Sequence, residues 1–170
     1  MHKDGGFTLI ELLIVVTIIG ILAAIGVPGL LRARQSGNEA SAIGSVRAVI
    51  SGQTAFASSC GGGGYAEGLT ALLTGAGGGP PFVSPDVAPI KRGYLIANTG
   101  SGGIVLAAAE TCNLITDSRG GYLATATPQS PGSTGQRSFG SDQQGTIYQD
   151  NTGAVPVAPL TAGGTVSVLQ

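Results

Sequence analysis

The 170-residue chain has few charged and few aromatic side chains. Asp, Glu, Lys and Arg together make up 10% of its residues and the formal net charge is −1, so nothing in the charge predicts a nucleic-acid partner. Aromatic residues make up 5%, whereas there are 30 glycines, and this composition predicts a weak core and long loops. A domain of this kind needs a cross-link or contacts with neighbouring chains for its stability.

Histidine occurs once, as His2, in a short polar stretch at the N-terminus. Removal of this stretch on maturation would leave no histidine, which excludes histidine-based catalytic triads and most zinc sites and removes the commonest general base. We therefore expect no enzyme activity, no cofactor and no metal centre. Asp142, Gln143 and Asp150 carry oxygen atoms of the kind that bind calcium, but their spacing is not that of an EF-hand, and turn formation is the simpler interpretation.

One long apolar run dominates the N-terminal part of the chain. It extends from Gly6 to Leu31 with the sequence GFTLIELLIVVTIIGILAAIGVPGLL, and no charge falls between Glu11 and Arg32. About 20 apolar residues, at roughly 1.5 Å per residue, make enough helix to cross the hydrocarbon core of a bilayer. Because the run has no polar face, it needs an apolar environment on every side, either lipid or copies of itself.

Glu11 is the one charge inside this run, and an unpaired carboxylate there costs on the order of a few kcal/mol. It therefore needs a partner. The polar leader before the run ends in Gly5 and Gly6, which make an accessible backbone easy to present to a protease. Cleavage after Gly6 would place a free amine on Phe7, four residues before Glu11. That amine is largely cationic at neutral pH and is the one counter-charge for Glu11 in the apolar part of the chain.

These features resemble the N-terminal processing and assembly segment of the type IV pilin superfamily, which includes the type II secretion pseudopilins. In this resemblance Gly6 precedes the scissile bond, and Phe7 is the new N-terminal residue that prepilin peptidase exposes and N-methylates. Glu11 matches the glutamate that is implied to neutralise the N-terminal amine of a neighbouring subunit during assembly. Gly20 and Pro28 match the helix-weakening positions of the family.

The resemblance covers Gly6 to about Arg34 and implies a structural protein. It predicts a subunit of a type IV pilus-like filament, held in the inner membrane before assembly and found in an extracellular or periplasmic filament afterwards. The implied partners are copies of the chain, prepilin peptidase, the inner-membrane assembly machinery, and the lipid bilayer before assembly. A type II secretion pseudopilin and a membrane-anchored extracytoplasmic binding module that never polymerises are the alternatives. The sequence does not separate a major from a minor pilin.

The apolar run also allows two simpler interpretations. A secretory signal peptide has a basic start and small residues such as Ala23 and Ala24, but its apolar region is about 7–15 residues long and holds no acid. An uncleaved single-pass anchor would hold Glu11 at the helix start through the helix dipole. Neither interpretation explains the junction between Gly6 and Phe7.

The helical pattern continues beyond the apolar run, from Leu30 to about Ser58. Pro28 lacks a backbone N–H, so with the neighbouring glycines it predicts a kink or a loosened turn between Gly20 and Pro28. Farther on, apolar residues recur at steps of three, four and seven, which predicts an amphipathic helix. The predicted apolar stripe consists of Leu31, Ala40, Ile43, Val46, Ile50 and Ala57, and the residues expected largely elsewhere are Arg32, Arg34, Asn38, Glu39, Arg47 and Gln53.

Cys60 and Cys112 are the two cysteines of the chain. The anchor implies export to an oxidising compartment, where an even pair normally forms a disulfide. Closing a loop of roughly 50 residues would stabilise the fold by about 3–4 kcal/mol in the chain-entropy model. A metal pair is disfavoured because CxxC spacing and histidine are both missing.

The remainder of the chain contains short strand signals separated by glycine-rich segments. Gly61–Gly64 ends the long helix, and a second glycine run lies at Gly75–Gly79. We interpret both runs as flexible connections because neither has the lysine of a phosphate loop. A short helix is predicted at Leu69–Leu73. The candidate strands are Gly93–Asn98, followed by a turn at Thr99–Gly103 and by Ile104–Ala109 as a partner strand or short helix, then Gly121–Thr127, Gln136–Asp142 and Thr146–Gln149. The segment from Asn151 to Gln170 is either an edge strand, at Thr165–Leu169, or a surface arm that contacts a neighbouring subunit.

These elements predict an α+β fold in which a long N-terminal helix packs its amphipathic half on an antiparallel sheet of three or four strands, as in pilins. The predicted organisation has four parts. They are a leader at residues 1–6 that is removed on maturation, a transmembrane and filament-core helix at 7–31, an amphipathic helix half at 32–60, and a globular β-sheet domain with glycine-rich loops at 61–170.

Overall fold

A computed structural model describes residues 7–169 of the chain. The chain divides into two compact units, Met1–Arg34 and Gln35–Gln170. Helix α1 (Leu9–Ser59) extends through both units. It is helical without interruption through Gly20 and Pro28, so the turn between these residues is not unwound in the single chain.

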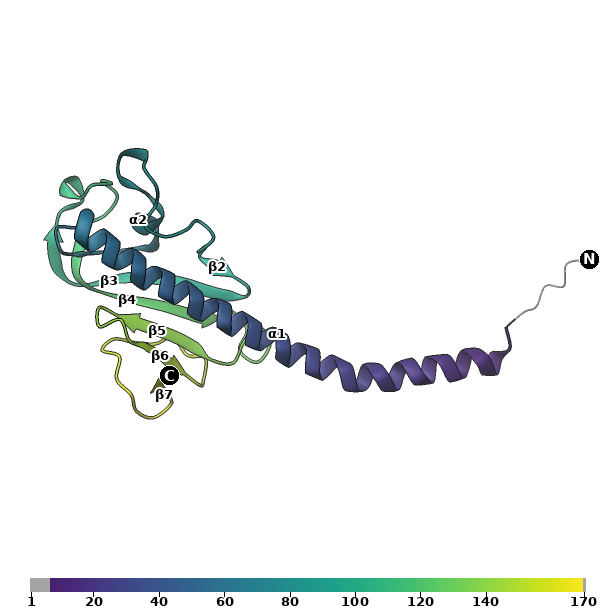
Figure 1. The fold of residues 1–170 in the computed structure, drawn as a ribbon. Coiled ribbons are helices and arrows are strands. Elements are labelled where there is room, and N and C mark those ends of the chain that lie inside the picture. Colours follow the sequence, from purple (N-terminus) through teal and green to yellow (C-terminus); the bar gives the residue numbers. More distant parts are fainter. Residues whose placement is uncertain (1–6, 170) are drawn as a thin grey trace, which may run out of the picture. The chain divides into compact units, whose positions relative to one another are not determined.

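The second unit consists of the C-terminal part of α1 and one antiparallel sheet (Figure 1). Strands β2 to β7 follow one another in sequence order across the sheet, and β1 pairs with one end of β4. The strands are β1 (Tyr65–Ala66), β2 (Ile90–Lys91), β3 (Tyr94–Leu106), β4 (Ser118–Pro128), β5 (Ser138–Asp142), β6 (Ile147–Asp150) and β7 (Val166–Val168), and the short helices are α2 (Leu69–Leu73), η1 (Ala76–Gly78) and η2 (Ala108–Glu110). The predicted α+β fold is confirmed, although the sheet has more strands than expected.

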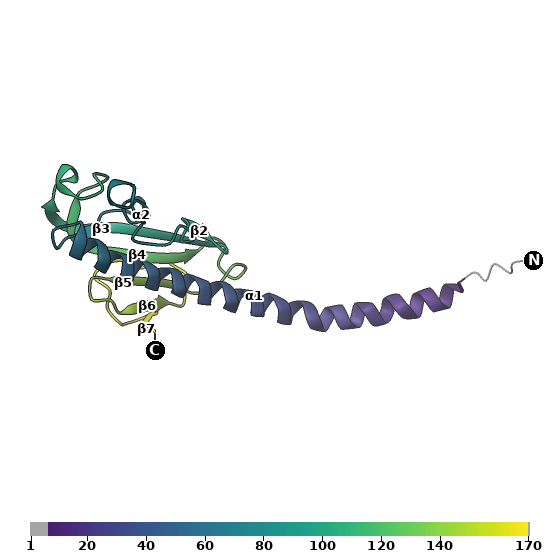
Figure 2. The same ribbon diagram turned by 45° about the horizontal axis from the view of Figure 1, so that its top comes forward.

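Helix and sheet together define two ends of this unit (Figure 2). At the entry end, the chain enters the unit at Gln35, and β3 begins at Tyr94 opposite Pro128 of β4. At the far end, α1 ends at Ser59, and β3 ends at Leu106 opposite Ser118.

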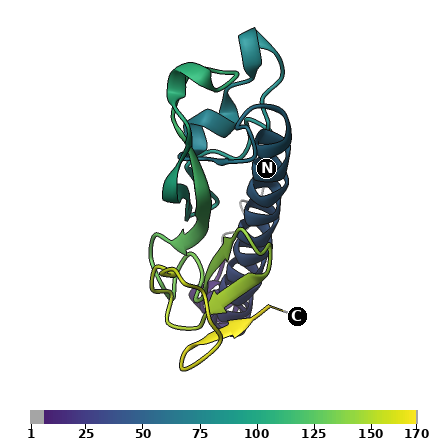
Figure 3. The same ribbon diagram turned by 90° about the vertical axis from the view of Figure 1, so that its left-hand side faces the viewer.

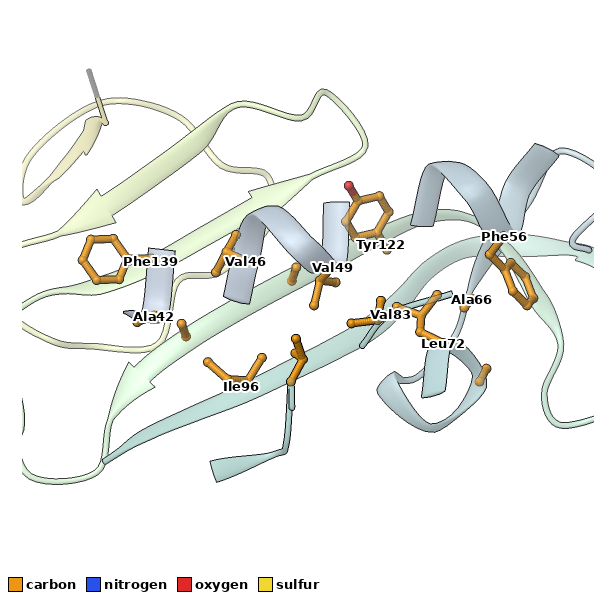
Figure 4. Close-up of a cluster of buried hydrophobic side chains, with 14 of the residues drawn as sticks. Ala42, Val46, Val49, Phe56, Ala66, Leu72, Val83, Ile96, Tyr122 and Phe139 are labelled. Atoms are coloured by element: carbon orange, nitrogen blue, oxygen red, sulfur yellow. The ribbon is translucent and has the colours of Figure 1, made fainter. Parts of the chain in front are cut away.

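The core lies between α1 and one face of the sheet (Figure 3). Fully burying a Val, Ile or Phe side chain contributes about 1.5–3 kcal/mol each, so this layer provides most of the apolar stabilisation of the unit. Figure 4 shows side chains of α1 facing those of the central strands. The large buried side chains include Val46, Val49, Phe56, Leu72, Tyr94, Ile96, Tyr122 and Phe139.

The buried face of α1 is not the stripe that the sequence predicts. Val46 is the one residue that the two sets share, and Glu39 and Gln53, expected on the polar side, are buried. Gly52 explains part of the difference, because a Cβ atom there would lie 2.2 Å from Cγ2 of Val83 and the helix could not approach so closely. The buried residues of α1 are Glu39, Ala42, Ser45, Val46, Val49, Gly52, Gln53 and Phe56.

Gln53 is fully buried and joins α1 to two strands. Its Nε2 donates to the Ala66 carbonyl at 3.0 Å and to Oδ1 of Asn98 at 2.9 Å, and its Oε1 accepts from the Ala66 N–H at 2.8 Å. Asn98 also donates to the Ala66 carbonyl, at 2.9 Å. Burying a polar group without partners is costly, so this complete set of bonds explains both why Gln53 is tolerated in the core and why β1 forms beside it.

The run Gly61–Gly64 is a packed turn, so its interpretation as a flexible connection is wrong. The Gly61 N–H donates to the Phe56 carbonyl at 2.8 Å and the Gly63 N–H to the Ala57 carbonyl at 3.0 Å, which satisfies the end of α1. A Cβ atom at Gly61 would lie 2.1 Å from the Gly64 carbonyl oxygen. Glycine is needed here because the backbone itself fills the space that a side chain would occupy.

The predicted turn at Thr99–Gly103 is also wrong, since β3 continues to Leu106. The strand remains paired with β4 through this region and absorbs the glycines as register shifts between Ser101 and Leu106. Gly102, with φ of +75°, adopts the left-handed conformation that such an irregularity needs. Cross-strand hydrogen bonds thus override the local turn signal.

Of the two alternatives that the sequence leaves open for the C-terminal segment, the structure has the edge strand. Val166–Val168 forms the edge strand β7 beside β6. Before it, the chain covers the sheet face opposite α1, where the Ser138 hydroxyl donates to the Ala154 carbonyl and a Cβ atom at Gly140 would lie 2.9 Å from Pro156.

Candidate assembly segment

The apolar part of α1 has a fully exposed surface. Sixteen large apolar side chains between Phe7 and Leu31 are 52–89% exposed, and the most apolar window of α1 has a mean hydropathy of 2.8. Among residues 7–169, α1 is the one helix long and apolar enough to cross a membrane, on length and composition alone. Apolar surface of this extent requires lipid or protein to cover it.

Thr8 and Glu11 form a capping box at the start of α1. The Thr8 N–H and hydroxyl donate to Oε2 of Glu11 at 3.0 and 2.8 Å, and the Glu11 N–H donates to the Thr8 hydroxyl oxygen at 3.3 Å. A threonine followed three residues later by glutamate is a known helix-start pattern, and the sequence interpretation missed it. Both bonds from Thr8 end on Oε2, so Oε1 accepts no hydrogen bond from residues 7–169.

Of the other predicted assembly residues, Gly20 and Pro28 lie in the same helix, and Phe7 lies two residues before it begins. Phe7 is 89% exposed, and Gly20 has open space within 4 Å of where a Cβ atom would stand. Pro28 lies inside the helix, where it cannot donate the hydrogen bond that its position would otherwise make. Gly6, the predicted processing residue, lies outside the described residues together with the rest of the leader.

Three side chains of α1 hold the loop between β4 and β5 at the entry end. Gln35 donates to the Gly132 carbonyl at 2.5 Å and Asn38 to the Thr134 carbonyl at 2.9 Å. Glu39 forms an ion pair with Arg137 in which Oε2 lies 2.6 Å from Nη2. We call these contacts the entry clamp, because they fasten the sheet to the first turns of α1 within this unit.

Glu39 accepts more hydrogen bonds than its ion pair with Arg137 alone would give. Its Oε2 also accepts from Nε of Arg137 at 2.9 Å, and its Oε1 accepts from the N–H groups of Gln136 and Arg137 at 2.9 and 3.1 Å. Burial of the carboxylate would by itself raise the pKa of Glu39, but the Arg137 guanidinium and the two N–H groups outweigh burial and lower this pKa below its ordinary value.

Because of this lowered pKa, we expect the stability of the fold to decrease in acid. A carboxylate whose pKa is lower in the folded chain contributes stability that is complete above its unfolded pKa and is lost as the pH falls through the folded pKa. The Tm of the wild-type chain should therefore fall as the pH is lowered below the pKa of glutamate in the unfolded chain, about 4.3, and through the lower pKa of Glu39 in the folded chain. The Glu39→Gln variant should be less stable by about 1–3 kcal/mol at neutral pH and should lose less on acidification.

Circular dichroism melts of the full-length protein at a series of pH values measure this dependence. Glu110→Gln is the matched control, since Glu110 is an exposed carboxylate without an ion pair among residues 7–169 and should melt with the wild-type pH profile. If Glu39→Gln lost stability in parallel with the wild type on acidification, the assignment of this pH dependence to Glu39 would be wrong.

Cys60 and Cys112 form a disulfide, as predicted, with their Cα atoms 4.8 Å apart. The bond joins the end of α1 to the loop that connects β3 and β4 at the far end. The calcium candidates are not brought together, because Asp142 and Asp150 lie at opposite ends of the β5–β6 pair. Each caps its own turn, Asp142 accepting from the Gln144 N–H and Asp150 from the N–H and hydroxyl of Thr152.

Comparison with known proteins gives matches to the N-terminal part of the chain. Residues 1–27 match the family model described as the prokaryotic N-terminal methylation motif. The type IV major pilin protein PilA of Myxococcus xanthus is 43% identical over 54 residues, which are 32% of this chain and 24% of that protein. These matches support the type IV pilin superfamily.

A second pilin extends this result. The type IV wide pilus major component PilA4 of Thermus thermophilus is 59% identical over 39 residues, which are 23% of this chain and 30% of that protein. The chain thus spans less than a third of the length of the two pilins that it matches. No solved structure matches the chain. The similarity to pilins lies in the methylation motif and the helix that follows it.

Proposed function

We propose that this chain is a structural subunit of a type IV pilus-like filament. The observation that supports this proposal most strongly is that the methylation motif continues into an unbroken helix. The apolar surface from Phe7 to Leu31 is exposed, and one carboxylate interrupts it. Both curated relatives are named as major components of type IV pili, which supports the same role for this chain.

Maturation in this proposal begins with prepilin peptidase, which cleaves between Gly6 and Phe7 in the inner membrane. The amine of Phe7 is then N-methylated, and the apolar helix remains in the bilayer until assembly. Removal of the leader places a cation next to a segment that otherwise holds Glu11 as its single charge. The Cys60–Cys112 disulfide is consistent with a second unit that folds outside the cytoplasm.

Assembly exchanges lipid for neighbouring helices around Phe7–Leu31. During this exchange the Phe7 amine of one copy pairs with Glu11 of its neighbour, and Oε1 of Glu11, which Thr8 leaves free, is the oxygen that receives it. The ion pair removes the cost of two isolated charges in an apolar environment and sets the register between copies. The segment from Gly20 to Pro28 is the part of the helix that unwinds when copies pack together.

Two alternatives share part of these features. A type II secretion pseudopilin would carry the same motif and assemble in the same way inside the periplasm. A membrane-anchored extracytoplasmic binding module would retain the apolar helix in lipid and never polymerise. Neither needs an enzymatic activity, and the described residues contain no group of three metal-binding side chains.

Intact-mass and N-terminal analysis of the mature protein tests the proposal. We expect loss of residues 1–6 and a methylated Phe7, with the same protein recovered from sheared surface filaments seen by electron microscopy. Gly6→Leu should abolish processing and leave the precursor in the membrane, whereas Gly5→Leu, one residue before, serves as the matched control and should be processed. An intact leader on the wild-type protein, or assembled but unprocessed Gly6→Leu protein, would contradict the proposal.

A further inference from the structure

The turn between β2 and β3 at the entry end presents a basic side chain. Arg92 is exposed and has φ of +49°, a conformation that costs energy for any residue except glycine and, to a lesser extent, Asn or Asp. Among residues 7–169, no carboxylate lies within 4 Å of Arg92, while the neighbouring Lys91 is paired with Asp86 at 2.7 Å. Arg92 therefore has a strained backbone and a cationic side chain that makes no ion pair within the described chain.

Two exposed apolar side chains accompany this cation. Ile90 and Leu95 are register partners in β2 and β3 and are 56% and 44% exposed. Register partners of an antiparallel pair stand beside each other on the same face of the sheet. The entry end thus carries a patch of Ile90, Arg92 and Leu95, which we call the basic patch.

The far end carries a patch of the opposite sign beyond the end of β3. Glu110 is exposed in η2, and from residues 7–169 its carboxylate accepts a single hydrogen bond, at 3.3 Å from the Ala107 N–H. Leu114 is 66% exposed at φ of +57°, and Ile104 is 57% exposed. We call Ile104, Glu110 and Leu114 the acidic patch. Glu67 and Asp117 add two more carboxylates at this end, against one guanidinium, that of Arg119.

The loop that displays Leu114 is anchored at the two residues that precede this leucine. Asn113 is 9% exposed and donates to the carbonyls of Ala71 and Thr74 at 2.8 and 3.0 Å. Cys112 is tied to Cys60 by the disulfide. Packing within the chain does not explain an exposed leucine on a strained backbone, whereas presentation of an apolar side chain to a partner does.

We propose that the acidic patch of one copy contacts the basic patch of the next copy, with Glu110 paired to Arg92 and the apolar side chains packed beside them. The two patches lie at opposite ends of the same strand, β3, so a displacement along this strand brings them together. The two patches have opposite charges and consist of different residues. A head-to-tail contact that repeats along an open filament requires two different, complementary surfaces of this kind. The inference rests on the proposed function, because it assumes that copies of the chain follow one another along a filament. It adds a contact between copies outside the N-terminal helix.

A chemical cross-link within the full-length protein tests this contact. In the Arg92→Lys variant, which keeps the charge, a carbodiimide can couple the new amine to a carboxylate in direct contact. Positions 92 and 110 of one copy are separated by the 13 residues of β3, about 40 Å of extended strand, so a link between these positions must join two copies. The neighbouring Lys91–Asp86 pair provides an internal control for the reagent.

Mass spectrometry of treated membranes and sheared filaments should find the 92–110 link together with the 86–91 link. Glu110→Gln, which keeps an oxygen that can accept from the Ala107 N–H, should abolish the first link and leave the second. Absence of the 92–110 link where the 86–91 link forms, or coupling of the introduced amine to other carboxylates alone, would overturn the proposal. If filaments form without the 92–110 link, the proposed contact is wrong and the proposed pilin function is unaffected. If the link forms in a chain that never forms filaments, the contact is supported and the pilin function is wrong.

A second variant separates assembly from folding. Arg92→Asn removes the charge but suits the positive φ better than arginine does, so the Tm should stay the same or rise. We nevertheless expect at least about tenfold fewer filaments, as for a lost ion pair between copies. Wild-type filament numbers from Arg92→Asn would show that Arg92 makes no contact that assembly needs.

Discussion

Filament yield is expected to fall at least about a hundredfold when Glu11 is replaced by glutamine. Removing one partner of a desolvated ion pair costs about 3–5 kcal/mol, because the other charge is left in an apolar environment. A change of about 3 kcal/mol corresponds to more than a hundredfold in an equilibrium. Glu11→Gln takes away the charge and keeps the side-chain shape, so the helix start and membrane insertion should remain intact. Quantitative mass spectrometry of sheared filaments and of membrane fractions measures both quantities.

The capping box provides a control that separates the charge of Glu11 from its local bonds. Glutamine at this position can still accept from Thr8, since capping boxes use either glutamate or glutamine. Thr8→Val has the converse effect, because it removes the hydroxyl that bonds to Glu11 and leaves the carboxylate in place. Loss of a cap costs typically about 1 kcal/mol, so Thr8→Val should reduce filament yield far less than Glu11→Gln. Equal losses from the two variants would show that the cap, rather than the charge, is what assembly requires.

Removal of the disulfide is the second change with a large expected effect. Cys60 and Cys112 are separated by 52 residues, and opening a loop of this length should lower the free energy of unfolding by about 4 kcal/mol. The bond closes the far end, where the end of α1, the Gly61–Gly64 turn and the loop that displays Leu114 meet. We expect the Cys60→Ala/Cys112→Ala variant to melt at least about 10 °C below the wild type.

Thermal melts of the full-length protein in detergent micelles, followed by circular dichroism, measure this loss. Ser58→Ala is a suitable control because Ser58 is exposed on the same turn of α1, and its Tm should change little. Reduction of the wild-type protein should reproduce the shift of the double variant. An unchanged Tm in both cases would mean that the bond contributes nothing to the stability of the fold.

Several elements could be predicted from the sequence because their signals are local. The apolar run from Gly6 to Leu31 depends on composition alone, and its leader and acid lie within a few residues of one another. The short helix at Leu69–Leu73 and the approximate end of α1 follow from breakers next to them in the chain. The disulfide follows from the count of two cysteines in a chain whose apolar N-terminal run implies export.

Other features depend on partners far away in the sequence and were missed for that reason. Glu39 looked like a surface residue, yet its partner Arg137, 98 residues later, makes its burial possible. The helical pattern likewise places Gln53 on the polar side, although Asn98 and Ala66 satisfy its hydrogen bonds inside the core. Periodicity along a helix records how apolar each position is, and it carries no information about a polar partner on another element.

The amino-acid sequence is enough to establish that the N-terminal helix needs lipid or copies of itself, that Glu11 is its single charge, and that a helix and an antiparallel sheet follow. The folded structure was needed to show which face of α1 is buried, that Gly61–Gly64 is a packed turn, and that β3 runs unbroken through its glycines. The physical reason is that an exposed apolar helix is specified by its own side chains, whereas burial of polar groups and close backbone packing are specified by pairs of segments that meet only when the chain has folded.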